Sequence, residues 1–449
     1  MMLKKLSLVA FVLCLGLFSC QQNKKVTFDE GIQKINHVVV IYMENHSFDN
    51  LWGEFEGADG IANAKKANIT QVDKKGKPYE ALPDIPRSSA FPSNLPNETF
   101  NIDQYIPSDK ESPSPTHQYY HEIMQIDGGK MDKFAAYNSN KGMAMGYYNT
   151  KKLPLYPLAK QYTLCDHFFH SGFGCSYFNH VFLIAAAPAV WKDAPDYMVA
   201  KVDSNGKMIK NGLVTPDGYV VNTVFPKNPP YPPKADTSEL LPPQTLPTIG
   251  DRLSEKNISW AWYSGDWDSA VAGKPSGYAY NHQPFIYFAN YAPGTEGRKH
   301  MKDETEFIAA AKAGNLPSVS FVKPAHKYDE HPGYSTVYYG EKHAVELANA
   351  VLNGPNGKDA LVIITYDENG GFWDHVAPPV IDRWGPGTRV PTIIISPYAK
   401  KGYVDSTQYE SVSILAFIEK RWDLQPLTDR DKNANPLENA FDFNPKELH

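Results

Sequence analysis

Two short polar pairs could do chemistry, because each directly follows a run of apolar residues that predicts a buried strand. In HVVVIYMENHSFDN, residues 37–50, the run ends on Glu44 and Asn45. In ALVIITYDENGGFWDHVAPP, residues 360–379, it ends on Asp367 and Glu368. If both strands are parallel in an open α/β sheet, their carboxyl ends share the ligand crevice, and the four side chains converge there.

These four side chains offer only oxygen ligands. Carboxylates at close quarters raise one another's pKa unless a cation lies among them. Oxygen donors favour a hard divalent ion, and Ca²⁺, Mg²⁺ and Mn²⁺ all suit them. Each pair taken alone is equally well explained as a helix N-cap or loop contact at the strand end. The repeated pattern favours one divalent metal ion, whose identity stays open.

A candidate nucleophile lies in HSGFGCSYFNHVFLIAAA, residues 170–187, where Ser176 falls at the start of an apolar helix. A hydroxyl there lies among unpaired N–H donors and at the positive end of the helix dipole, which favour an alkoxide and an adjacent anion. A serine in this position more commonly caps the helix, and spacing alone favours the cap.

Histidines supply the remaining chemistry. The chain has 14, and four of them fall in loops rich in Gly, Pro and aromatic residues: His117, His282, His331 and His375. Imidazolium supplies both a charge and a proton, so loop histidines suit phosphate binding and general acid work. Taken singly, each is more commonly a structural or surface residue.

The elements that must position these residues alternate along the chain. Strands are expected at 38–43, 162–169, 258–264, 318–324, 360–366 and 392–396, and helices at 178–187, 247–256, 303–313, 340–353 and 408–422. Several strand runs are apolar without alternation, which indicates strands covered on both faces. The pattern predicts an α/β fold, a largely parallel sheet sandwiched by helices.

Composition bounds the class of protein and its organisation. With 449 residues, 42% of them hydrophobic, the chain can bury a large core. A net charge of -6 gives no basic surplus, so a nucleic-acid partner is disfavoured. Residues 196–247 change to Pro, Gly, Asn and Lys, and we expect an insertion there, a hairpin-bearing flap or lid. The catalytic domain is predicted at 35–423, with a C-terminal extension at 424–449.

The N-terminus predicts export. Lys4 and Lys5 precede an apolar run, and LFSC resembles a lipobox, so residues 1–19 are expected to be a signal peptide and Cys20 a lipidated membrane anchor with a tether to residue 34. An ordinary secretory signal is the alternative, and a transmembrane helix fits the short run less well. The mature protein is expected in the periplasm or on the cell surface. There Cys165 and Cys175 can pair or remain two buried thiols.

Several blocks together resemble the bacterial phosphoesterase family that contains acid phosphatases and non-specific phospholipases C. They are HVVVIYMENHSFDN, GCSYFNH, HQPF, EHPGY and YDENGGFWDHVAPP, spread over most of residues 36–423. The resemblance implies an alkaline-phosphatase-like α/β fold with the insertion over the site. It also implies that Glu44, Asn45, Asp367 and Glu368 hold the metal, which Ser176 touches as nucleophile. His117, His282 and His331 would then surround the phosphoryl group.

Details within the blocks favour the acid phosphatase branch. Ser176 precedes Asn179 and His180, as in that branch, and Asn179 is expected to contact the substrate. His46 stands where the family commonly has Arg, and Asn281 replaces the first His of a frequent His-His-Gln-Pro block. We therefore expect a metal-dependent acid phosphatase that acts on phosphate monoesters through a phosphoserine, assisted by protonated histidines.

Two alternatives remain from the sequence. A phospholipase C would need a choline site, which Trp52, Trp267 and Tyr280 could supply by cation–π contact unless they belong to the core. A surface lipoprotein that only binds a glycan or peptide is less consistent with the intact acids and Ser176. The oligomeric state is left open.

Overall fold

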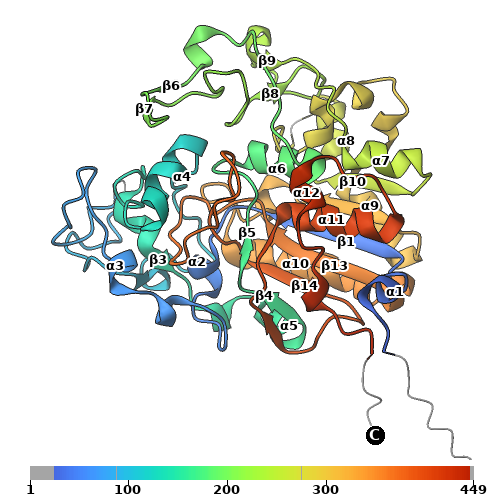
Figure 1. Ribbon diagram of the computed structural model, residues 1–449, viewed down its shortest axis with the longest axis horizontal. Coiled ribbons are helices and arrows are strands. Elements are labelled where there is room, and N and C mark those ends of the chain that lie inside the picture. Colours follow the sequence, from blue (N-terminus) through green and yellow to red (C-terminus); the bar gives the residue numbers. More distant parts are fainter. Residues whose placement is uncertain (1–24, 87, 275, 445–449) are drawn as a thin grey trace, which may run out of the picture.

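The centre of the protein is an eight-stranded sheet. The computed structural model describes residues 25–86, 88–274 and 276–444 (Figure 1). Neighbouring strands run in the order β11 (Met301–Asp303), β10 (Trp260–Ser264), β12 (Val319–Lys323), β1 (His37–Met43), β13 (Ala360–Tyr366), β14 (Thr392–Ile395), β4 (Thr163–Cys165) and β15 (Tyr403–Asp405). β14 is antiparallel to both neighbours, and every other adjacent pair is parallel.

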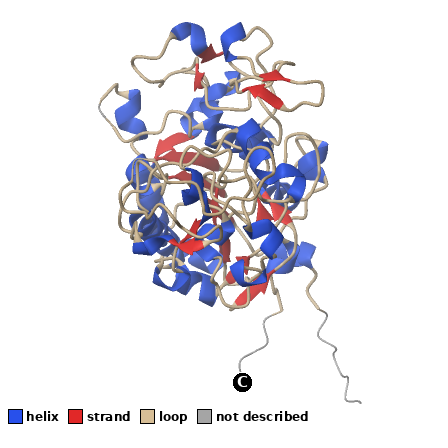
Figure 2. Ribbon diagram, turned by 90° about the vertical axis from the view of Figure 1, so that its left-hand side faces the viewer, coloured by secondary structure: helices blue, strands red, loops and turns tan. Residues whose placement is uncertain are grey.

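The strands are apolar because both faces of the sheet are covered. Every residue of β10, β12, β13 and β14 is buried, and so is β1 after His37. In Figure 2 the strands lie among helices and loops. α10 (Val337–Leu352) packs against β1 and β13, whereas α6 (Ser176–Ala185) packs against α7 (Ile249–Glu255) and α11 (Ser411–Trp422). The predicted α/β class with a largely parallel sheet is confirmed.

One strand prediction is completed by the structure and another needs correction. The run at 392–396 forms β14 as predicted and is antiparallel to its neighbours, a direction that was not predicted because a continuous apolar run indicates burial and not strand direction. The run at 162–169 breaks into β4 and β5 (Phe168–Phe169), and β5 pairs with β16 (Tyr409–Glu410) in a separate ladder. The break falls at Asp166, which is buried and accepts a hydrogen bond from Asp59 N at 2.7 Å.

Most of the other regular elements are short, and α9 (Glu304–Ala313) packs against β10, β11 and β12. This helix starts with a capping box, in which Asp303 and Glu306 satisfy each other's free backbone N–H groups. The remaining elements are α1 (Phe28–Ile32), α2 (Phe48–Trp52), α3 (Lys66–Ile69), α4 (Tyr119–Ile126), α5 (Tyr156–Gln161), α8 (Trp267–Val271), α12 (Asp429–Lys432), β2 (Phe100–Asn101) and β3 (Gly146–Tyr147).

The predicted insertion at 196–247 forms the upper part of the molecule in Figure 1. It contains a hairpin, β6 (Lys201–Val202) with β7 (Met208–Lys210), and a parallel pair, β8 (Phe225–Pro226) with β9 (Leu240–Leu241). Asn222 Oδ1 accepts a hydrogen bond from Tyr119 N at 3.0 Å, and the Cys175 thiol contacts Val221 O at 3.5 Å. The insertion therefore packs beside the segments that carry His117 and Ser176.

Both ends of the described chain pack together. Phe28 of α1 lies in the range predicted as a tether, and its ring contacts those of Phe417, Phe441 and Phe443 at 6.1–6.3 Å. The domain limits 35–423 and 424–449 stay predictions. The signal peptide and lipidated Cys20 lie outside the described residues. Among the residues described, the structure contains no helix long and apolar enough to span a membrane.

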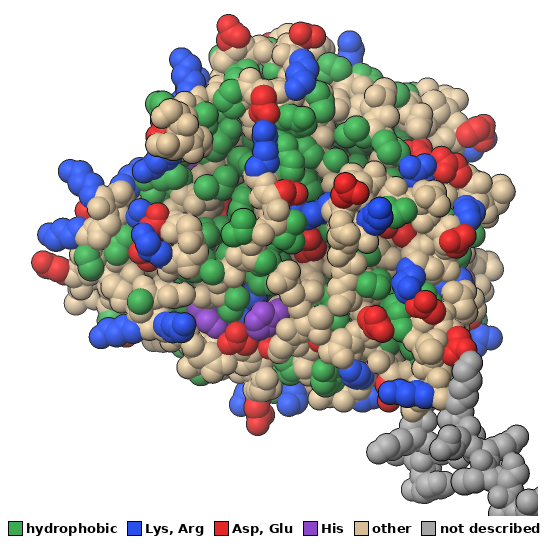
Figure 3. All heavy atoms as spheres, in the orientation of Figure 1, with side chains coloured by type: hydrophobic (Ala, Val, Ile, Leu, Met, Phe, Trp, Pro, Cys, Tyr) green, Lys and Arg blue, Asp and Glu red, His purple; other side chains and the backbone are tan. Residues whose placement is uncertain are grey.

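Charged side chains of both signs lie on the surface (Figure 3), and two cysteines lie in the interior. On the face shown in Figure 3, side chains of Lys and Arg are interspersed with those of Asp and Glu. Cys165 and Cys175 are both free and buried, so of the two alternatives left open by the sequence the structure has the unpaired thiols. Burial raises the pKa of Cys175 to about 12 and that of Cys165 well above its usual range, so both thiols are inert.

Candidate active site

The carboxyl ends of β1 and β13 bring the two polar pairs together, as predicted. The strands are parallel and in register, with Met43 opposite Tyr366. Asp367 N donates to Met43 O at 3.1 Å, which continues the ladder one step beyond the strands. Glu44 and Asp367 therefore leave the sheet side by side, each followed by its second polar residue.

Ser176 lies over these strand ends as the first residue of α6. Its Oγ donates to Glu44 Oε2 at 2.8 Å and accepts from Asn45 Nδ2 at 3.0 Å. The N-cap of the helix is Cys175, so the capping role that spacing alone favoured for Ser176 is wrong. The hydroxyl is 3% exposed and is directed at the acidic cluster.

The turn that presents Ser176 is built by glycine and by Asn179. Gly174 adopts a φ of +75°, which favours glycine. The Asn179 amide accepts from Gly172 N at 2.9 Å and donates to the carbonyls of Gly172 and Gly174 at 2.8 and 3.1 Å. Its polar atoms are thus taken up by the turn. This assigns Asn179 a structural role in place of the predicted substrate contact.

The three carboxylates are fully buried and perturb one another. Burial and the charge of Glu44 raise the pKa of Asp367 well above its usual range. Burial and Asp367 do the same to the pKa of Glu368. Burial acts to raise the pKa of Glu44 as well, but His282 and Lys323 hold it well below its usual range. The cluster holds more negative charge than its buried surroundings stabilise.

Lys323 is a member of the site that the sequence analysis did not identify. It ends β12, the neighbour of β1, and its Nζ lies 2.8 Å from Glu44 Oε1 and donates to Tyr42 O at 3.2 Å. The available signal was a lysine closing a third apolar strand run, SVSFVK. Because β12 is parallel to β1, this lysine reaches the same edge of the sheet.

The residues present fit a divalent cation. Glu44, Asp367 and Glu368 carry three negative charges and Lys323 one positive charge, which leaves two to neutralise. Asn45 Oδ1 and Asp367 Oδ2 are buried and accept no hydrogen bond from the described residues. Orphaned oxygen acceptors beside unbalanced carboxylates are the ligands a hard cation takes. The cluster can therefore hold a metal ion.

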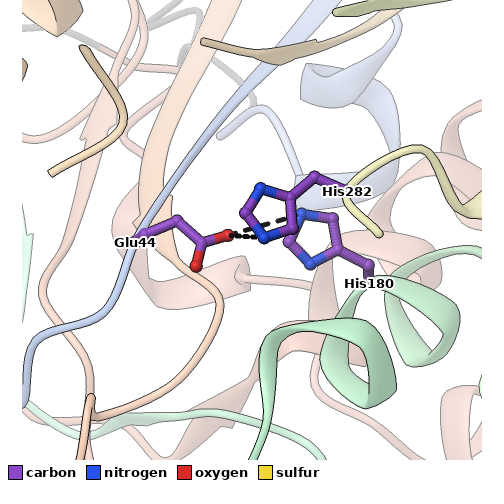
Figure 4. Close-up of side chains that lie close together, drawn as sticks. All are labelled: Glu44, His180 and His282. Atoms are coloured by element: carbon purple, nitrogen blue, oxygen red, sulfur yellow. Dashed lines mark ion pairs between the residues drawn. The ribbon is translucent and has the colours of Figure 1, made fainter. Parts of the chain in front are cut away.

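Two stacked histidines close one side of this cluster (Figure 4). His282 Nε2 is 3.2 Å and His180 Nε2 3.9 Å from Glu44 Oε1, and the two rings stack with centroids 4.9 Å apart. Glu44, His180 and His282 form one of the groups whose ligand atoms lie close enough to share an ion. The sequence analysis missed His180, although its position one helical turn after Ser176 was a signal.

His117 and His331 close the other side. His117 Nε2 lies 3.9 Å from Glu368 Oε1, and the His117 and His331 rings are 5.5 Å apart. Burial lowers the pKa of His117 to about 4 and that of His282 well below its usual range. Three of the four predicted histidines, His117, His282 and His331, thus lie around the acidic cluster that Ser176 contacts. The expectation that they are protonated needs correction for His117 and His282, because desolvation outweighs the nearby carboxylates.

His375, singled out from its loop, belongs to a separate cluster. Its Nδ1 lies 2.7 Å from Asp49 Oδ2. The buried Arg389 guanidinium makes ion pairs with Asp374 at 2.9 Å and Asp49 at 3.1 Å. The place of a cation is thus taken by Arg389, and the cluster ties the loop after β13 to α2. Asp49 and Asp374, the last acidic residues of the two sequence signatures, therefore belong to this structural network.

The α/β fold and the acidic cluster at its strand ends, which can hold a metal ion, are consistent with a hydrolase, and comparison of sequences gives the family. The pattern of the Phosphoesterase family matches residues 35–425, nearly the whole described chain. The chain therefore belongs to the Phosphoesterase family, in agreement with the resemblance seen in its sequence blocks.

Curated relatives are phospholipases C. The non-hemolytic phospholipase C of Pseudomonas aeruginosa is 24% identical over 460 residues, which cover 92% of this chain but 58% of the relative. Phospholipase C B of Mycobacterium tuberculosis is 24% identical, with 91% of this chain and 78% of the relative covered. The chain thus spans less than two thirds of the length of the Pseudomonas protein.

Solved structures show a distant likeness. A protein in the alkaline phosphatase superfamily from Vibrio parahaemolyticus aligns over 74% of both chains, with 10% identity and a TM-score of 0.35. A phosphonate monoester hydrolase of Agrobacterium radiobacter aligns over 87% of this chain and 74% of its own, with 9% identity and a TM-score of 0.33.

Proposed function

We propose that this protein is a metal-dependent phosphatase that hydrolyses phosphate monoesters through a phosphoserine on Ser176. The observation that carries the proposal is the hydrogen bond of 2.8 Å from Ser176 Oγ to Glu44 Oε2, at the junction of a helix N-terminus and two parallel strand ends. A hydroxyl held on a carboxylate among backbone N–H donors is poised for nucleophilic attack.

The metal would be held by Glu44, Asn45, Asp367 and Glu368, with Ser176 beside it. A divalent ion there supplies Lewis acidity, which lowers the pKa of the serine hydroxyl and withdraws charge from phosphoryl oxygens. The protein's own groups do the rest. Glu44 Oε2 takes the hydroxyl proton, and the ring nitrogens of His117, His282 and His331 surround the equatorial oxygens.

Phospholipase C activity is the second candidate, because the curated relatives bear that name. Two of the three aromatic residues considered for a choline site do not favour it. Trp52 is fully buried against Phe55. Trp267 is 5% exposed, and the Arg298 guanidinium already lies 4.7 Å from its ring. Neither indole is open to a quaternary ammonium, and of the three only the half-buried Tyr280 is left to supply that contact.

A purely binding role is disfavoured by the same geometry. A degenerate site would have no reason to keep three buried carboxylates around a hydroxyl that contacts one of them at 2.8 Å. Export and attachment to a membrane through lipidated Cys20 remain part of the proposal, as do small phosphorylated substrates. They rest on the sequence alone.

A substrate panel separates these candidates. Protein beginning at residue 25 is assayed with p-nitrophenyl phosphate, an alkyl phosphate, bis-p-nitrophenyl phosphate and p-nitrophenylphosphorylcholine, after loading with Ca²⁺, Mg²⁺ or Mn²⁺ and after chelation. The proposal expects turnover of both monoesters that is lost on chelation. Turnover confined to the phosphorylcholine ester would select the phospholipase, and no turnover of any ester would favour a binding protein.

A further inference from the structure

His326 lies in this site, although no motif singled it out. It follows β12, and its ring centroid is 5.3 Å from that of His282 and 6.2 Å from that of His331. It thereby completes an arc of five imidazoles in the order His117, His331, His326, His282 and His180, with successive centroids 5.5, 6.2, 5.3 and 4.9 Å apart. One end of the arc faces Glu368 and the other faces Glu44.

The ring nitrogens of the arc are engaged differently. Nδ1 of His117, His331 and His180 lies 2.7–2.8 Å from a backbone carbonyl, and His282 turns Nε2 toward Glu44. Within the arc, only His326 has Nδ1 at hydrogen-bond distance from a carboxylate, Asp329 Oδ2 at 3.0 Å, whereas His282 Nδ1 lies 3.9 Å from the same oxygen. The Nε2 of His326 makes no hydrogen bond to any residue that the structure describes. An imidazole oriented by a buried carboxylate, with the opposite nitrogen open, is the arrangement used in proton transfer.

Exposure places His326 on the leaving-group side. Its side chain is 27% exposed, against 17% for His117 and 2% for His282. Ser176, which attacks phosphorus in line, is 3% exposed on the floor of the site. In an in-line displacement the leaving oxygen departs opposite the nucleophile, hence toward solvent. The open nitrogen of His326 is therefore on the side where a proton is needed.

We propose that His326 is the general acid that protonates the leaving alcohol, with Asp329 as its positioning residue. The inference rests on the proposed phosphatase function and adds a catalytic residue to it. As the bond from Ser176 Oγ to phosphorus forms, the bond from phosphorus to the ester oxygen breaks. That oxygen takes the proton from His326 Nε2, and the serine proton passes to Glu44 Oε2.

The second half-reaction restores every group. Water attacks the phosphoserine, its proton goes to His326 Nε2, and Ser176 Oγ recovers its proton from Glu44. One ester and one water thus give one alcohol and one phosphate. No further reactant is required.

The surroundings of His326 hold it in this role. The titratable groups that face it are Asp329, His282, His331 and Tyr334, whose ring stacks on it at 4.6 Å. Asp329 is fully buried, its Oδ1 accepts from His331 N at 2.9 Å, and its carbonyl accepts from Glu44 N at 2.8 Å. The carboxylate is therefore fixed to β1, the strand that delivers Glu44.

The test compares two esters that differ in their need for a proton. An alkyl phosphate requires a general acid, whereas p-nitrophenolate leaves almost unaided. His326→Asn is expected to lower kcat/KM for the alkyl ester by about 100-fold or more and for p-nitrophenyl phosphate by less than about tenfold. The alkaline limb of the alkyl-ester pH profile should disappear in the variant and be retained in the wild type.

His343→Asn is the matched control. That histidine also has a carboxylate partner, Glu304 at 2.6 Å, and stacks on a tyrosine, Tyr328 at 4.6 Å, but its contacts are with α9 and the chain before α10. It should leave both rates unchanged. Thermal melts of both variants establish that they are folded.

Each of the following results would overturn the inference. Equal losses for both esters would assign His326 to phosphate binding. Loss of bound metal from His326→Asn by elemental analysis would make it a ligand, since His282, His326 and Asp329 have nitrogen and oxygen atoms within 4.8 Å of one another. A wild type that turns over neither ester would refute the proposed function, and this inference with it. A wild type active on both, with the variant's ratio unchanged, would refute only the role of His326.

Discussion

At the scale of single residues, the environment of Ser176 explains why one hydroxyl in the chain can be a nucleophile. Another serine, Ser411, also begins a buried helix, α11, and its Oγ has no hydrogen-bond partner among the described residues. Ser176 differs because its Oγ contacts both Glu44 and Asn45. Many serines lie at helix termini, and the contacts with Glu44 and Asn45 are what distinguish Ser176.

Ser176→Ala is expected to lower kcat by about 10³-fold or more, the range for loss of a covalent nucleophile. Because Cys175 provides the N-cap, the free energy of unfolding should change by only about 1 kcal/mol. Steady-state kinetics and thermal melts measure both, with Ser411→Ala as the control that keeps full turnover. Substantial turnover by Ser176→Ala would transfer the attack from the serine to a water molecule.

Asp367→Asn tests the metal ligands. It removes a charge from a buried cluster in which Asp367 Oδ2 has no hydrogen-bond donor, so metal affinity should fall by about tenfold or more. Calorimetric titration of the chelated protein measures the affinity. Asp359→Asn, at the opposite end of β13, should leave it unchanged. Equal affinities of Asp367→Asn and wild type would show that the cluster has been wrongly assigned.

At the scale of elements, β1, β12 and β13 matter because their parallel ends deliver side chains to one place. β12 brings Lys323, β1 brings Glu44 and Asn45, and β13 brings Asp367 and Glu368. α6 then lays Ser176 across them, and the Asn179 amide holds the preceding turn. Helix α10, on β1 and β13, carries a buried carboxyl of its own, Glu341.

Burial raises the pKa of Glu341 to about 8, even though Leu155 N donates to its Oε2 at 2.8 Å. A carboxyl whose folded pKa exceeds its unfolded value binds its proton more tightly in the folded state. Its stabilising effect is complete below about pH 4.5 and is lost as pH rises to about 8. Glu341→Gln should therefore raise Tm relative to wild type at pH 9 and change it little at pH 5.

Thermal melts at both pH values measure this difference. Glu80→Gln, at an exposed acid that makes no ion pair with a described residue, is the control and should have no pH-dependent effect. An equal shift of Tm for Glu341→Gln at pH 5 and pH 9 would contradict the raised pKa.

At the scale of the whole molecule, the reactivity of the two cysteines tests whether the interior excludes solvent. Cys165 is fully buried in β4, and Cys175 is buried against the insertion. Protein beginning at residue 25 should show no thiol that reacts with Ellman's reagent when folded and two when denatured without reductant. Denatured, unreduced protein without free thiols would favour the other alternative, a disulfide between Cys165 and Cys175.

The sequence predicted those parts of the fold and site that depend on local pattern. The apolar run ending at Glu44 marked β1 within one residue, and the run ending at Asp367 marked β13. The direction of β14 was not predicted, because an apolar run indicates that a strand is buried but not which strands it pairs with. Asn179 was misassigned for the opposite reason, since the motif gave its proximity to Ser176 but not the direction of its amide.

The missed site residues share one cause. Lys323, His326 and Asp329 lie on or after β12, outside the quoted blocks, and His180 lies within one block without an assigned role. Strand pairing and the turn of α6 bring all four to the acidic cluster, which the blocks alone do not show. His375 shows the converse, because it stands within the second signature yet faces Asp49 and Asp59. The register of β12, β1 and β13 is needed to separate the residues of the acidic cluster from residues such as His375, which lie within a signature but outside that cluster.

The central claim is that phosphate is transferred to Ser176, and a trapping experiment tests it most directly. Metal-loaded protein is mixed with p-nitrophenyl phosphate, quenched in acid within milliseconds and over longer times, digested, and analysed by tandem mass spectrometry. The account predicts a peptide spanning residues 170–187 that carries one phosphate on Ser176, formed during turnover and absent from Ser176→Ala. Full turnover without any phosphorylated peptide, or with phosphate on a histidine, would contradict it.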